Sequence, residues 1–209
     1  LPHDPCRGNS IRNAFRIINQ AEKMEKKEFT ISVFSEHKVG LLHRITVIFS
    51  RRKINIESLN TSESEISGIY RFTIVIRTTE DMAKSVTRQI EKQIGILKAF
   101  YHTLDEIVYQ EIALYKVPTA AFAYGDEVEI LIRRHNARIL TIEPEYIIVE
   151  KTGHKEETSQ LFRELEPYGI LQFARSGRIA LTKQIKEITA YLKDIDKHHE
   201  ETADEVLTY

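Results

Sequence analysis

The chain has 209 residues, of which 42% are hydrophobic and 29% charged, with eight glycines, five prolines and one cysteine. This composition is typical of a globular protein and excludes collagen-like and low-complexity chains, and no apolar stretch approaches the ~18 residues of a membrane span. The single cysteine, Cys6, excludes an intramolecular disulfide framework and indicates a reducing compartment, so we expect a cytoplasmic protein.

The charge is balanced along the chain. The net charge is −1, and residues 1–27, 28–104 and 105–209 carry +3, +3 and −7 respectively. None of these segments is as basic as a protein that binds the phosphate backbone of nucleic acids. We therefore expect neither nucleic acid nor a membrane as a partner.

Residues 1–26 differ from the rest. They begin with Leu1, show no strand alternation and lack the apolar core of ~7–15 residues that a signal peptide needs. We interpret them as a leader that is disordered or foreign to the fold. A transit peptide stays open, because the segment contains three arginines.

The hydrophobic periods of residues 28–104 predict one compact unit. Alternation over 29–33 predicts a half-buried strand, and Leu41, Ile45 and Ile48 predict a helix opened by Gly40. The order β-α-β-β-α-β is the ferredoxin-like arrangement. Its other elements are a strand from Ile54 to Thr61, a hairpin loop over 62–68, a strand from Ile69 to Thr78, a helix with Met82, Val86, Ile90 and Ile94 on one face, and a strand from Ile96 to Leu104.

The same order recurs in the second half. The predicted elements are a strand from Ile107 to Val117 ended by Pro118, a helix with Val128, Leu131, Ile132 and His135 on one face, hairpin strands over 137–142 and 146–150, a helix with Leu161, Phe162 and Leu165, and a strand over 170–174. We therefore predict an α+β fold of two tandem ferredoxin-like βαββαβ units, over 27–104 and 105–183. An amphipathic C-terminal extension is predicted over 184–209.

No catalytic constellation is present in the sequence. It contains no G-x-S-x-G elbow, Walker loop or G-x-G-x-x-G, and Cys6 lies in the leader. The histidines are scattered, and His198 and His199 are more simply explained by a polar tail than by a metal site. We expect no catalytic residue, no metal ligand and no cofactor in this chain.

The most informative segment is the turn from Ser35 to Leu42. A strand ends here and a helix begins at Gly40, where free backbone N–H groups could bind a carboxylate. Neighbouring apolar side chains and Asn55 would complete a site for a small free amino acid. A purely structural glycine is the alternative interpretation.

Three strings of residues carry a family resemblance. Glu36-His-Lys-Val-Gly-Leu-Leu-His-Arg44, Ile48-Phe-Ser-Arg51 and Asn55-Ile-Glu-Ser-Leu59 resemble the ACT domain of the acetolactate synthase (acetohydroxyacid synthase) small subunit. The similarity continues through 111–117 and ends with Phe173-Ala-Arg-Ser-Gly177, so that it covers nearly all of residues 27–183.

The resemblance implies a non-catalytic regulatory subunit in branched-chain amino acid biosynthesis. Such a subunit forms a homodimer through its ACT domains, activates a catalytic large subunit and confers feedback inhibition by a branched-chain amino acid, valine first among them. Thiamine diphosphate, Mg²⁺ and FAD are expected in the large subunit.

The resemblance also implies an effector site. Gly40 matches the family glycine, and Asn55 and Ile56 match residues that face the ligand across the dimer interface. His37 stands where better-known members have Asn, which leaves open which amino acid binds. The other implied site residues lie in the loop, the first helical turn and the second helix: Lys38, Val39, Leu41, Leu42 and Gln89.

Two other classes of function remain as alternatives. An ACT-domain transcription regulator that senses amino acids would need a helix-turn-helix, and residues 1–27, the only spare segment, do not show one. A free-standing enzyme would need catalytic residues that the sequence does not supply.

Overall fold

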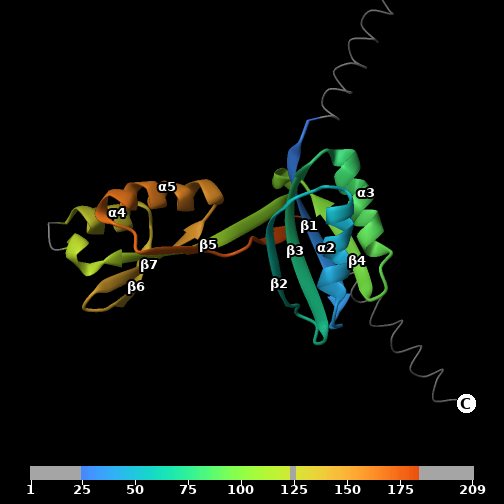
Figure 1. Cartoon of the computed structure of the whole chain (residues 1–209), viewed down its shortest axis with the longest axis horizontal. Helices are drawn as coiled ribbons and strands as arrows, with labels where there is room; N and C mark the ends of the chain where they lie inside the picture. The colour runs from blue at the N-terminus through green and yellow to red at the C-terminus, as the bar shows by residue number, and fades with distance from the viewer. Residues whose placement is uncertain (1–24, 123–125, 184–209) are drawn as a thin grey trace, which may run out of the picture. The chain divides into compact units, whose positions relative to one another are not determined.

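The computed structural model of the chain describes residues 25–122 and 126–183 (Figure 1). The described residues form two compact units, 25–106 and 107–183. The predicted leader lies outside the described residues except for Glu25 and Lys26, and the predicted C-terminal extension lies wholly outside them.

The first unit is an antiparallel sheet with two helices on one face (Figure 1). The strand order is β2-β3-β1-β4, so that β1 and β3 are central and β2 and β4 form the edges. The elements in chain order are β1 (Lys27–Glu36), α2 (Leu41–Arg51), β2 (Ile56–Glu63), β3 (Ile69–Thr78), α3 (Glu80–Glu91), β4 (Ile96–His102) and a short 3₁₀ turn (Leu104–Glu106).

Strand β1 is buried on both faces, which corrects the prediction of a half-buried strand. Phe29, Ile31 and Val33 pack into the core under the helices, as their alternation predicts. Phe34, on the opposite face, is nevertheless only 1% exposed. Part of its cover is the guanidinium of Arg71 from β3, 5.5 Å from the centre of the Phe34 ring. A central strand receives such cover from the long side chains of its neighbours.

Several predicted boundaries of the first unit were wrong. Strand β2 ends at Glu63 and β4 at His102, where Thr61 and Leu104 were predicted. Two further errors lie at turns. Helix α3 ends at Glu91, and Ile94 is 79% exposed in the turn before β4, where Gly95 has a positive φ of 88°. Strand β2 begins at Ile56 and not at Ile54, because Lys53 takes a left-handed φ of 54°. In both places the backbone turn interrupts an apolar pattern that runs past it.

The second unit repeats the topology of the first. Its sheet has the order β6-β7-β5-β8, and helices α4 and α5 lie on one face (Figure 1). The predicted α+β fold of two ferredoxin-like units is therefore confirmed. The elements are β5 (Ile107–Pro118), η2 (Thr119–Phe122), α4 (Glu127–Arg134), β6 (Arg138–Ile142), β7 (Tyr146–Gly153), α5 (Lys155–Leu165), η3 (Glu166–Tyr168), β8 (Gln172–Arg175) and β9 (Ile179–Thr182).

Strand β9 was not predicted. It pairs with the first part of β5, from Ile107 opposite Thr182 to Gln110 opposite Ile179. Strand β8 covers only the stretch of β5 from Ala113 to Lys116. The long strand β5 therefore accepts two short partners in succession along one edge.

A buried tyrosine joins the sheet and a helix of the second unit. Tyr115 on β5 is fully buried, and its hydroxyl donates a 2.6 Å hydrogen bond to the carbonyl of Thr158 on α5. Its ring also contacts Phe173 of β8, with ring centres 5.2 Å apart. Burial raises the pKa of Tyr115 to about 12, because the phenolate would lose its hydration.

We expect Tyr115→Phe to lower the free energy of unfolding by about 1 kcal/mol at pH 7, the usual net value of one hydrogen bond. A tyrosine titrates near pH 10 in the unfolded chain, below its folded pKa of about 12. The stabilisation is therefore fully present below about pH 10 and is lost as the pH rises toward 12. Urea unfolding of the wild-type chain and of Tyr115→Phe at several pH values should show that the difference between their free energies of unfolding shrinks as the pH rises above about 10.

Tyr146→Phe is the matched control for this prediction. Tyr146 is half-buried beside Lys116, and its hydroxyl has no hydrogen bond within the part of the chain that the structure describes. An equal loss of stability in the two variants at pH 7 would contradict the role assigned to the Tyr115 hydroxyl.

Candidate functional site

The turn between β1 and α2 exposes backbone at the start of a helix. Gly40 is the N-cap of α2 with φ 81°, and no side chain caps this helix end. A Cβ built on Gly40 would have no heavy atom within 4 Å, so the backbone here is open to a ligand. The first N–H groups of a helix have no partner inside it, and they attract a carboxylate.

The loop before Gly40 is held in place by the neighbouring hairpin. The imidazole of His37 stacks on the ring of Tyr70, with centres 4.3 Å apart and planes 18° apart. The His37 backbone N–H donates to the carbonyl of Gly68 at 3.1 Å. Lys38 forms an ion pair with Glu36. These contacts fix the conformation of a loop whose outer surface stays accessible.

The three apolar residues predicted for the loop and the first helical turn differ in exposure. Val39 is fully exposed and Leu42 is 38% exposed, whereas Leu41 is 2% exposed and belongs to the core. Leu41 packs against the turn at Gly95, where an added Cβ would lie 2.9 Å from its side chain. Within one chain, Val39 and Leu42 therefore present the apolar surface beside Gly40.

Asn55 and Ile56 lie at the other end of the sheet from Gly40. Ile56 pairs with Ile76, which pairs with Phe29 near the start of β1, whereas Gly40 follows Glu36 at the end of β1. The seven residue-to-residue steps from Phe29 to Glu36 span about 23 Å of strand. Asn55 is exposed and Ile56 packs at the edge of the core. One copy of the chain cannot place both ends around one amino acid.

Gln89 lies in the helical layer. Its side-chain oxygen accepts a 3.0 Å hydrogen bond from Nε of Arg52, at the end of α2. It lines a polar groove along α3, together with several cations. This groove was not predicted from the sequence, although the spacing of Lys84, Arg88 and Lys92 on one helix is a usable signal.

Two other pairs of titratable side chains make contacts that serve the fold. The ring nitrogen Nε2 of His135 lies 3.0 Å from Oε2 of Glu164, and this contact lowers the pKa of Glu164. His154 and Glu157 form a capping box at the start of α5. Within residues 25–122 and 126–183, no group of three or more histidine, cysteine or acidic side chains could hold a metal ion.

No helix in the described ranges is long and apolar enough to cross a bilayer.

Two family profiles match the chain, one on each unit. A profile described as an AHAS small subunit-like ACT domain matches residues 31–98. A second, described as the small subunit of acetolactate synthase, matches residues 110–184.

Individual acetolactate synthase small subunits are similar to this chain across both units. The acetolactate synthase small subunit of Mycobacterium bovis is 34% identical over 160 residues, which cover 77% of this chain and 95% of that protein. The acetolactate synthase small subunit of Bacillus subtilis is 32% identical over 171 residues, which cover 81% of this chain and 98% of that protein. The crystal structure of the small subunit from Thermotoga maritima has the same fold, with a TM-score of 0.69 at 24% identity, covering 76% of this chain and 98% of that one.

We expect Gly40→Ala to lower the free energy of unfolding by about 1–2 kcal/mol, because φ 81° is a left-handed conformation that a Cβ disfavours. No clash adds to this cost, since the space around Gly40 is open. Lys53→Gly is the converse control, because glycine removes the strain of the left-handed φ of 54° at this position. This gain offsets the entropy cost of glycine, so the free energy of unfolding should change by less than about 1 kcal/mol. Urea unfolding measures both, and an unchanged stability of Gly40→Ala would contradict the assigned turn.

Proposed function

This chain belongs to the acetolactate synthase small-subunit family, and we propose that it activates a catalytic large subunit and confers feedback inhibition by a branched-chain amino acid. The observation that carries the proposal is the 34% identity to a curated small subunit across 95% of that protein. Thiamine diphosphate, Mg²⁺ and FAD would then be bound by the large subunit. The matches span both units and do not favour a transcription regulator.

The proposed effector site lies between two copies of the chain. Gly40 and Asn55 belong to opposite ends of one sheet, so that a second copy must supply one of them. The helix N-terminus at Gly40 would bind the carboxylate, Val39 and Leu42 would contact the aliphatic side chain, and Asn55 of the second copy would close the site.

The edge strand β2 provides a geometry for such a dimer. It is an outer strand of its sheet, and within the described residues its other edge has no strand partner. Two copies related by a two-fold axis would pair β2 with β2 in antiparallel fashion. The start of one β2, beside Asn55, would then lie next to the end of the other. Glu63, at that end, pairs with Tyr70 of β3, and Tyr70 pairs with Ser35 at the end of β1. The end of β2 therefore lies at the same end of the sheet as the Gly40 loop.

The test is reconstitution with the cognate large subunit. Acetolactate formation from pyruvate should rise when the full chain is added and should fall again with valine, leucine or isoleucine. Gly40→Asp should abolish the inhibition and leave the activation largely intact, because its carboxylate would repel that of the effector. Gly169→Asp is the control for backbone strain, since Gly169 belongs to the second unit, has a similar φ of 86° and leaves an added Cβ only an ordinary contact of 3.7 Å with Pro118.

Two results would contradict the proposal in different ways. A large subunit whose activity does not change when the chain is added would contradict the regulatory role. Retained inhibition in Gly40→Asp would leave the regulatory role intact and show that the effector does not bind at this turn.

A further inference from the structure

A polar groove of about 640 Å³ runs along α3. Four of its lining residues are cations, and one is an acid. The residues that matter for its chemistry are Arg52, Asp81, Lys84, Arg88, Gln89 and Lys92. None of the loop residues from His37 to Leu42 lines it, so the groove is distinct from the turn at Gly40.

Three cations of the groove stand in one row. Lys84, Arg88 and Lys92 follow each other at intervals of four residues, which places them on one face of α3 and its C-terminal end. All three are exposed, and none forms an ion pair with a carboxylate among residues 25–122 and 126–183. The helix dipole favours Arg88 in the last turn and Lys92 at the C-cap, whereas like charges at a spacing of four residues repel each other, so a bound anion would relieve this repulsion.

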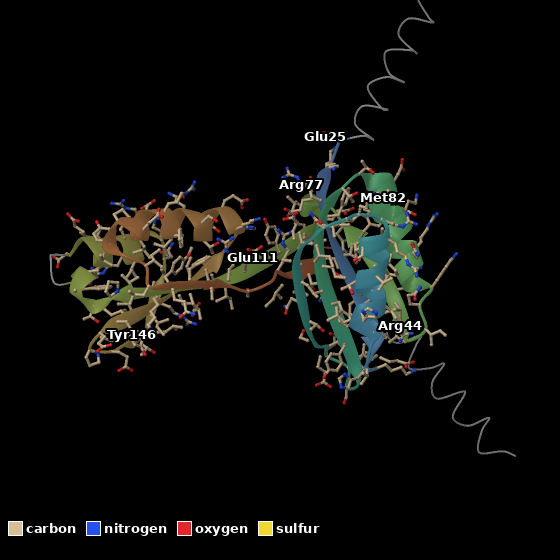
Figure 2. All side chains as sticks on the ribbon, viewed as in Figure 1. Glu25, Arg44, Arg77, Met82, Glu111 and Tyr146 are labelled. Atoms are coloured by element: carbon tan, nitrogen blue, oxygen red, sulfur yellow. The ribbon has the colours of Figure 1, made fainter. Side chains whose placement is uncertain are left out.

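The fourth cation is held in position by its neighbours. Arg52, at the end of α2, donates from Nε to Oε1 of Gln89 at 3.0 Å. Its Nη1 lies 3.4 Å from the sulfur of Met82, which Figure 2 labels on α3. Arg52 is half-buried, and two contacts restrain its guanidinium toward the groove. Less entropy is therefore lost when such a group binds an anion.

We propose that this groove binds a small molecule with several phosphate groups. Its volume falls in the range of small-molecule sites, and its lining is too polar for an aliphatic ligand. Arginine and lysine side chains form strong charge-assisted hydrogen bonds with phosphate oxygens. The single acid, Asp81, leaves a net charge of +3 on the groove. In this account, Gln89 orients Arg52 and does not contact the amino acid effector.

Calorimetric titration of the full chain with inorganic tripolyphosphate tests the proposal. The test variant is Lys84→Gln/Arg88→Gln, which removes two exposed cations from the groove. The control is Arg134→Gln/Lys155→Gln, which removes two exposed cations from α4 and α5 of the second unit. We expect the wild-type chain and the control to bind alike at ~0.15 M salt, where distant charges are screened, and the groove variant to bind at least tenfold more weakly.

Two results would overturn the proposal. The first is a wild-type chain that does not bind tripolyphosphate; if the groove variant alone then also loses binding to the large subunit, the groove contacts an acidic protein surface instead. The second is equal binding of tripolyphosphate by the two variants, which would indicate general attraction by surface charge. Valine inhibition of the groove variant is a separate readout, because it depends on the turn at Gly40 and not on the groove.

Discussion

The crossover from β1 through α2 to β2 is the constraint on which the account of this chain depends. Strands β1 and β2 both pair antiparallel with β3, so they run in the same direction. Helix α2 must therefore carry the chain back along the length of the sheet. The Gly40 turn and Asn55 flank this helix at its two ends, and no side-chain rearrangement within one copy can bring them together.

This separation explains how a small fold could respond to an effector. The first unit has a single core between one sheet and two helices, and β2 leaves an open edge. Pairing that edge with a second copy would satisfy its backbone groups and bring the two parts of the site together. An amino acid bound there would stabilise one dimer arrangement over another, with a coupling free energy of the order of 1–3 kcal/mol.

Local patterns in the sequence predicted most of the fold, and contacts between distant segments account for what they missed. Alternation in Phe29, Ile31 and Val33 correctly predicted the core face of β1, and the glycine at position 40 predicted a turn that has a positive φ. The cover over Phe34 depends on Arg71 of another strand and leaves no local signal. The groove combines Arg52 with residues 81–92, which follow it by 29 to 40 positions. Taken alone, the sequence of either segment predicts only solvated cations at the surface.

The most direct measurement mixes two defective chains. Gly40→Asp and Asn55→Ala are each expected to abolish valine inhibition of the reconstituted enzyme. When the two are unfolded and refolded together, a hybrid dimer has one site with both defects and one with neither, so about a quarter of all sites should be intact. The account predicts that inhibition partly returns in the mixture and stays absent in each variant refolded alone. A mixture as insensitive to valine as its components would contradict a site shared between two copies.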